Sequence, residues 1–185
     1  MSELNTIALS HNFLSQFAKE GSVCIDATAG RGYDTEFLCS LVGENGKVYA
    51  FDIQKEAIKS TEKLLSSKGY KNAEVILASH SDMDKFVKEQ VDCIVFNLGW
   101  LPKGDHNIHT KSESSIEAIE KGLSLLKNGG GMNIAIYYGR ETGFDEKDRV
   151  LEYLKTIDSL KYTVLVTEFS NRTNCYPISV FIYKD

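Results

Sequence analysis

The sequence lacks long apolar runs. None of its 185 residues lie in a stretch that approaches the roughly 20 apolar residues of a membrane-spanning helix. The first residues, with Glu3 and Asn5, also lack the basic and then apolar build of a secretory signal peptide. No internal repeat, low-complexity tract or linker interrupts the chain. We therefore expect one cytoplasmic domain over residues 1–185, with a leading helix within residues 1–20.

Metal-binding spacings are missing as well. The 4 cysteines are far apart with no C-x-x-C pair, and Cys24 and Cys93 lie within apolar runs. Such cysteines are typical of small buried side chains in a reducing compartment. The 4 histidines include no pair at i, i+4, the spacing that a helix would offer to zinc. The sequence therefore predicts no metal site.

Positive charge is also scarce. The formal net charge is −5, whereas proteins that hold nucleic acid mainly through phosphates are usually basic. This value argues against an extensive nucleic-acid footprint, although it is compatible with a local basic face. Hydrophobic residues make up 42% of the chain and charged residues 25%, which is ordinary for a globular protein.

What the sequence does contain is a glycine turn within residues 23–35. An apolar run ends in Asp26, and a loop with Gly30 and Gly32 leads into an amphipathic pattern that starts near Asp34. A strand, a tight turn and a helix start in this order let a ligand lie against bare backbone. The third glycine of the dinucleotide-binding pattern and the Lys-Ser/Thr pair of a phosphate loop are both missing.

A second predicted strand, over residues 47–52, ends in Asp52. This acid follows the turn by about 20 residues, where such folds place a carboxylate on ribose hydroxyls. Together, the turn and the acid resemble motif I and the acidic loop of class I S-adenosylmethionine-dependent methyltransferases. The alternative is an acid-ended strand and a helix-starting loop with no ligand.

Hydrophobic periodicity predicts five strand–helix units followed by two β-rich runs. No crossover helix fits between these runs, so they should form an antiparallel hairpin. We therefore expect an α/β, Rossmann-like class I methyltransferase fold, a mixed seven-stranded sheet with helices on both faces. The predicted strands cover residues 23–26, 47–52, 74–78, 91–97, 132–138, 162–169 and 178–183, and the predicted helices cover residues 6–19, 34–41, 55–68, 110–126 and 146–157.

Three local features refine this prediction. The helix over residues 6–19 is expected to cover one edge of the sheet and to roof the ligand, with His11 as a surface or packing residue. Asp34 or Thr35 is expected to cap the next helix. The glycines of residues 128–131 are expected to end the helix over residues 110–126, which a capping box at residues 110–113 opens.

In open α/β sheets the ligand lies beyond the carboxyl ends of the strands. Asp52 is expected to accept hydrogen bonds from the ribose of S-adenosylmethionine, with Ile53 and the Ser79–His80 pair bordering the adenine. Asp26 is expected to orient the loop or the amino group of the methionine portion. The predicted cofactor contacts are Asp26, Ala27, Gly30, Gly32, Asp34, Thr35, Asp52, Ile53, Gln54, Ser79, His80 and Asn97.

The end of the fourth strand suggests how a substrate is held. Asn97 and Trp100 have the spacing of the Asn/Asp-Pro-Pro-Tyr motif of amino-methylating enzymes, without its two prolines. The carbonyl of Asn97 can orient the N–H groups of a nitrogen nucleophile, while Trp100 offers a flat face to a base. The alternative for Trp100 is an aromatic ring wedged under a loop.

Other polar residues near the predicted strand ends are candidates for substrate contacts. Asp105 and His106 could take the proton that the nitrogen loses, although in-line alignment alone often suffices. The alternative is a turn residue and a solvated histidine. Lys103, Arg140 and Arg172 could meet phosphates of an RNA loop. Scattered surface charges are the alternative for these three residues.

The chain as a whole is similar to a small bacterial family known as "putative rRNA methylases". The resemblance covers nearly all of the sequence and rests on residues 25–35, 51–54, 79–80, 97–106 and 110–111. It implies methylation of the aminomethyl group of 5-aminomethyl-2-thiouridine at the tRNA wobble position, with S-adenosyl-L-methionine as cofactor and the anticodon loop as partner. A homodimer is a further expectation.

Three alternatives to this function remain open. The chain could methylate ribosomal RNA or a small molecule, because enzymes for either substrate would have the same predicted cofactor-binding residues. It could also be a non-catalytic nucleotide-binding module. An NAD-dependent dehydrogenase fits less well, because the glycine pattern and the terminal hairpin differ from those of dehydrogenases.

Overall fold

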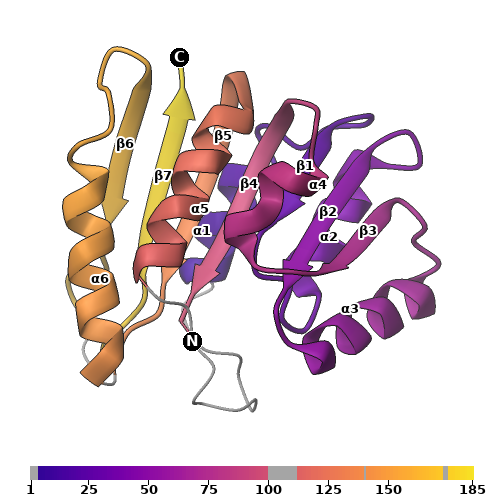
Figure 1. The fold of residues 1–185 in the computed structure, drawn as a ribbon, viewed down its shortest axis with the longest axis horizontal. Helices are drawn as coiled ribbons and strands as arrows, with labels where there is room; N and C mark the ends of the chain where they lie inside the picture. The colour runs from indigo at the N-terminus through magenta and orange to yellow at the C-terminus, as the bar shows by residue number, and fades with distance from the viewer. Residues whose placement is uncertain (1–3, 100–111, 140, 173–174) are drawn as a thin grey trace.

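The computed structural model describes residues 4–99, 112–139, 141–172 and 175–185. Seven strands form one sheet in the order β3-β2-β1-β4-β5-β7-β6 (Figure 1). Strand β7 runs antiparallel to β5 and β6, and the other pairs are parallel. The predicted mixed sheet with its terminal hairpin is therefore confirmed. The strands are β1 (Val23–Asp26), β2 (Lys47–Asp52), β3 (Ala73–Leu77), β4 (Val91–Leu98), β5 (Leu126–Ile136), β6 (Tyr162–Thr167) and β7 (Ile178–Lys184).

Helices lie on both faces of this sheet, as predicted. In Figure 1, α4, α5 and α6 lie in front of the strands, and α1 and α2 lie behind them. The helices are α1 (Thr6–Leu14), α2 (Tyr33–Val42), α3 (Lys55–Lys68), α4 (Met83–Phe86), α5 (Ser112–Leu125) and α6 (Glu141–Leu154), with a 3-10 turn η1 (His80–Asp82) before α4.

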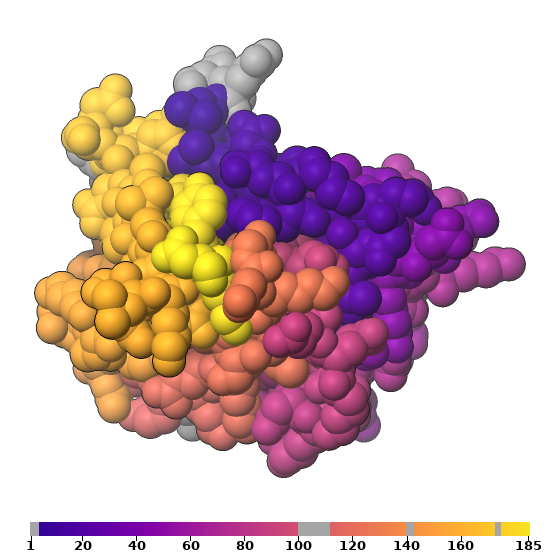
Figure 2. Space-filling model, turned by 90° about the horizontal axis from the view of Figure 1, so that it is seen from above, coloured from indigo at the N-terminus to yellow at the C-terminus, as the bar shows by residue number. Residues whose placement is uncertain are grey.

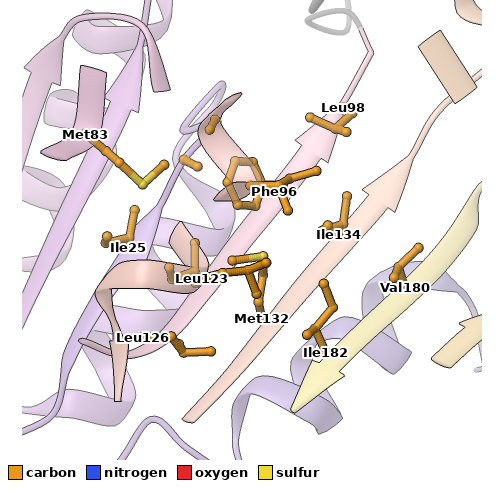
Figure 3. Packing of buried hydrophobic residues seen from close by; sticks show 14 of the residues in the cluster. Ile25, Met83, Phe96, Leu98, Leu123, Leu126, Met132, Ile134, Val180 and Ile182 are labelled. Atoms are coloured by element: carbon orange, nitrogen blue, oxygen red, sulfur yellow. The ribbon is translucent and has the colours of Figure 1, made fainter. Parts of the chain in front are cut away.

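Strand β4 runs through the centre of the molecule and separates two apolar cores. Phe96 lies near Met132 on the face covered by α4 and α5 (Figure 3), and Ile94 belongs to the same core. Cys93 and Val95 point to the opposite face, among the residues of α1 and α2. A strand that is buried on both faces needs apolar residues at nearly every position, which explains the apolar run over residues 93–96 of β4.

Helix α1 differs from its prediction in length and in place. It ends at Leu14 instead of residue 19. The chain then forms a turn, in which the backbone N–H of Phe17 donates to the carbonyl of Leu14, and the ring of Phe17 packs against that of Tyr183. It covers a face of the sheet and not an edge, since the ring of Phe13 contacts those of Phe181 and Tyr183 on β7 at 5.0 and 5.1 Å. Figure 2 shows this N-terminal helix in indigo beside the C-terminal strand in yellow.

The sequence predicts that the glycines of residues 128–131 end α5, but they do not. Helix α5 stops at Leu125, and β5 begins at once and contains all three glycines. The register between β4 and β5 shifts there, so that the extra residues of β5 bulge out. Close packing requires a glycine at position 131, because a Cβ there would lie 2.3 Å from the ring of Phe17.

Two helix starts also differ from the predictions. Helix α6 begins at Glu141 and not at residue 146, and its Gly143 lies against the backbone of Tyr138, where tertiary packing outweighs the poor helix propensity of glycine. Helix α2 is capped by neither Asp34 nor Thr35. Its N-cap is Gly32, with φ +86° and no side-chain cap. The two polar side chains are engaged elsewhere, at the carboxyl edge of the sheet.

Candidate active site

The carboxyl ends of β1 and β2 are tied together through Asp52. One oxygen of this carboxylate accepts a hydrogen bond from the backbone N–H of Gly30 at 3.0 Å, and the other accepts from that of Gln54 at 2.8 Å. Burial raises the pKa of Asp52, and the two N–H groups oppose that effect. The glycine loop is thus fixed to the end of β2. Ile53 beside it is 56% exposed, which leaves an apolar surface open to a ligand.

Asp26 lies fully buried beneath the same loop. Its carboxylate accepts hydrogen bonds from the hydroxyl of Thr35 at 2.6 Å and from the backbone N–H of Thr28 at 3.1 Å. Ala27 next to it is also buried, and its N–H donates to the carbonyl of Val95. Of the two roles expected for Asp26, this geometry favours orientation of the loop.

Burial and neighbouring charge act together on Asp26. Desolvation first, and then the nearby charge of Asp34, raise the pKa of Asp26 to about 7, with a smaller contribution from Asp52. Three carboxylates therefore share a small volume at the ends of β1 and β2. Because like charges repel, a positively charged ligand at this place would relieve the repulsion.

Replacing Asp26 by asparagine is expected to remove a pH-dependent cost to stability. Since the pKa of Asp26 in the folded state, about 7, lies above its usual value of 3.8, the contribution of this carboxyl to stability is greatest below pH 4 and is lost as the pH rises through 7. The melting temperature of the wild type relative to Asp26→Asn should therefore fall by several degrees between pH 5 and pH 8, at roughly 2–4 °C per kcal/mol. Calorimetry over this pH range measures the difference in melting temperature between the two proteins. A difference that does not change with pH would contradict the prediction.

A second group of polar contacts joins α1, α2 and β4. The Nε2 atom of His11 lies 2.7 Å from Oδ1 of Asp34, and the side-chain amide of Asn97 donates to Oδ2 of Asp34 at 2.8 Å. The backbone N–H of Asn97 donates to the hydroxyl of Thr28 at 2.7 Å. The ring of His11 is stacked on that of Phe37, with centroids 3.7 Å apart.

Sequence reasoning did not single out His11 and Thr28 as members of this group. The sequence predicts a surface or packing role for His11, and its place on a short amphipathic helix gives no signal for a partner in α2. Thr28 is one of several small residues in the glycine turn, and only the pairing of β1 with β4 brings it under Asn97. Both contacts depend on tertiary packing that no local motif encodes.

The residues expected to border the adenine lie near the carboxyl end of β3. His80 is only 8% exposed, and its ring lies edge-on to that of Phe96. Burial lowers the pKa of His80 to about 4, so the imidazole is neutral at physiological pH. The hydroxyl of Ser79 accepts from the backbone N–H of Ser81 and caps η1. Contacts of these residues with an adenine ring stay a prediction.

Most of the predicted substrate contacts lie outside the described residues, namely Trp100, Lys103, Asp105, His106 and Arg140. Arg172 is described, and it is engaged within the chain. Its guanidinium donates to the hydroxyl of Tyr176 and to the carbonyl of Leu4, and it lies 4.2 Å from the ring centroid of Phe169. A phosphate contact of Arg172 therefore stays a prediction, beside an observed role in joining the β6–β7 loop to the N-terminal segment.

Two absences apply to the residues that the structure describes. Within them, no group of three or more His, Cys, Asp or Glu side chains could hold a metal ion. None of the helices in these ranges is long and apolar enough to cross a membrane.

Comparison with known proteins identifies the family. A family model described as "Putative rRNA methylase" matches residues 48–183. The chain belongs to this family. A crystal structure of a putative rRNA methylase from Clostridium thermocellum is 46% identical, covers 100% of both chains and superimposes with a TM-score of 0.98.

Two more relatives extend this assignment to the cofactor. A putative methyltransferase from Streptococcus mutans, solved in complex with SAH, is 39% identical over 100% of both chains, with a TM-score of 0.91. The chloroplastic tRNA (mnm(5)s(2)U34)-methyltransferase of Arabidopsis thaliana is 33% identical over 95% of this chain and 68% of its own length. This rRNA methylase family member is an S-adenosylmethionine-dependent methyltransferase, and its fold is the Rossmann-like fold of class I enzymes.

The residues at the carboxyl edge fit S-adenosylmethionine. The cofactor carries positive charge on its sulfonium and amino groups, and the repulsion among Asp26, Asp34 and Asp52 is relieved by such a cation. The carboxylate of Asp52 is held in place by Gly30 and Gln54, as a group that binds ribose hydroxyls must be. Binding of the cofactor at this edge stays a prediction, with which these contacts agree.

Proposed function

We propose that this methyltransferase acts on RNA and methylates the aminomethyl group of 5-aminomethyl-2-thiouridine at the wobble position of tRNA. The observation that carries the proposal is the side-chain amide of Asn97 at the end of β4, whose NH₂ group is bound by Asp34. Its carbonyl then serves as a hydrogen-bond acceptor for a nitrogen nucleophile. The Arabidopsis relative is named for mnm(5)s(2)U34, the methylated form of this nucleoside, and so supports the choice of substrate.

Asn97 orients the nucleophile in this reaction. Its Oδ1 atom accepts a hydrogen bond from an N–H of the substrate amine. The lone pair of the substrate nitrogen then points away from the Asn97 amide and toward the methyl group. When bound, S-adenosylmethionine supplies that methyl group: the C–S bond breaks with its electron pair on sulfur, the lone pair forms the N–C bond, and the nitrogen releases one proton to water. Alignment by Asn97 is expected to provide most of the rate enhancement from this chain.

The wobble base suits an enzyme with little positive charge. It lies in a loop, so presenting it costs less unstacking than extracting a base from a duplex. A local basic face then suffices, for which Lys103, Arg140 and Arg172 are the candidates on a chain of net charge −5. The homodimer expected from the sequence also stays a prediction, which light scattering of the purified protein would test.

The experiment that tests the substrate uses tRNA from cells that lack the gene. The purified protein and labelled S-adenosylmethionine are added to this tRNA, and its nucleosides are separated by mass spectrometry. We expect one methyl group to appear on 5-aminomethyl-2-thiouridine and on no other nucleoside. Parallel reactions contain ribosomal RNA or a small-molecule extract from the same cells. Label in either of these, with none in tRNA, would overturn the proposal and favour one of the other two substrates.

A further inference from the structure

Three polar side chains from three different elements form a continuous hydrogen-bonded chain at the carboxyl edge. Helix α1 contributes His11, the first turn of α2 contributes Asp34, and the end of β4 contributes Asn97. Asp34 lies in the middle, with one oxygen 2.7 Å from His11 and the other 2.8 Å from Asn97. Nothing in the local sequence requires these contacts, and Asp34 gives up a capping role in α2 to make them.

The direction of each hydrogen bond follows from the chemistry of Asp34. An ionised carboxylate only accepts, so the group of Asn97 that faces Asp34 is its NH₂, and the Nε2 atom of His11 carries a proton. The carbonyl oxygen of Asn97 is therefore turned to the other side of the amide. One carboxylate thus decides which end of Asn97 is presented to a nucleophile.

Both ends of this chain are held by packing. The His11 side chain is 27% exposed and its ring is stacked nearly parallel, at 4°, on that of Phe37, which follows Asp34 in α2 by one turn. At the other end, the backbone N–H of Asn97 is bound by the hydroxyl of Thr28. A rotation of the Asn97 amide would leave Asp34 without its donor at a site where its side chain is only 19% exposed.

We propose that His11 and Asp34 are positioning residues that hold the amide of Asn97 with Oδ1 toward the substrate nitrogen. The inference rests on the proposed function in one respect, because it takes a nitrogen nucleophile as the partner of Oδ1. His11 acts only through Asp34, and Asp34 acts only through Asn97. The effects of changing these residues should therefore not add.

A double-mutant cycle with the full-length enzyme and tRNA tests this dependence. We expect His11→Ala to lower kcat about 10- to 100-fold, the range produced by misplacing a reacting group by up to about 1 Å. The KM for tRNA and the Kd for S-adenosylmethionine should change less than about threefold. In the Asn97→Ala background, His11→Ala should have no further effect on kcat.

Two matched variants complete the cycle. His11→Gln keeps an N–H donor for Asp34 and should recover most of the activity that His11→Ala loses. Asn12→Ala changes the exposed neighbouring residue of α1 and should leave kcat unchanged. The inference would be overturned if the double variant His11→Ala/Asn97→Ala lost the product of the two single-variant factors in kcat. A rise in KM with unchanged kcat in His11→Ala would also overturn it. Either result would assign His11 a purely structural role.

A measurement without substrate separates this inference from the proposed function. Side-chain amide signals of ¹⁵N-labelled protein identify Asn97 as the pair lost in Asn97→Ala. We expect one proton of that pair to be shifted by its bond to a carboxylate, and the shift to vanish in Asp34→Ala. An unshifted pair would overturn the inference even if tRNA is methylated, whereas a shifted pair with inactive wild-type enzyme would refute only the proposed substrate.

Discussion

Replacing Asp52 by alanine is expected to abolish measurable binding of S-adenosylmethionine. Each ribose hydroxyl that donates to the Asp52 carboxylate makes a charge-assisted hydrogen bond worth about 1.5–3 kcal/mol, so the loss of two weakens binding about 10²- to 10⁴-fold. The substitution also releases the backbone N–H of Gly30, which loosens the loop against which the cofactor lies. Isothermal titration calorimetry with S-adenosylmethionine measures the change directly.

Two control variants distinguish a lost ligand contact from a damaged fold. Asp92→Ala also removes a carboxylate that accepts from a backbone N–H, that of Val23. This contact lies at the amino end of β4, at the edge of the sheet opposite to Asp52. Its affinity for S-adenosylmethionine should match that of the wild type. Asp52→Asn keeps one acceptor oxygen and should bind with intermediate affinity. Equal affinity in Asp52→Ala and wild type would show that this carboxylate does not hold the cofactor.

Those parts of the fold that depend on short-range patterns could be predicted from the sequence. Helix α3 has its predicted bounds, because its apolar spacing is regular and Gly69, at φ +80°, stops it. Strand β4 was recognisable because a strand buried on both faces is almost continuously apolar, as residues 93–96 are. The pairing of the glycine turn with Asp52 was recognisable because residues at the ends of adjacent parallel strands must meet.

The rest of the site is decided by contacts between segments that are distant in sequence. Asp34 and Thr35 look like helix caps, but they bind Asn97 and Asp26, which their own helix cannot reveal. The glycines at the start of β5 look like a helix stop, but they lie within the strand, and Gly131 is needed because Phe17 packs against it. His11 looks like a surface residue until α1 is placed on the sheet. In each case tertiary packing overrides a local preference.

Changing Asn97 to aspartate is expected to lower kcat about 100-fold, although aspartate fills the same position in related amino-methylating motifs. The new carboxylate would face that of Asp34, at a place where the amide of Asn97 now donates over 2.8 Å. Two like charges at this separation repel, so the side chain at position 97 turns away and the nucleophile is misplaced. Binding of S-adenosylmethionine should change little, and single-turnover kinetics at pH 8 would measure the loss.

Exchanging the two residues should restore the activity. In Asp34→Asn/Asn97→Asp the amide at position 34 donates to the carboxylate at position 97, and its own carbonyl accepts from His11, so every contact keeps a donor and an acceptor. The carboxylate at position 97 still presents an oxygen to the substrate nitrogen. We expect kcat within about tenfold of the wild type, because alignment is regained. An exchanged enzyme no faster than Asn97→Asp alone would mean that the pair does not align the nucleophile.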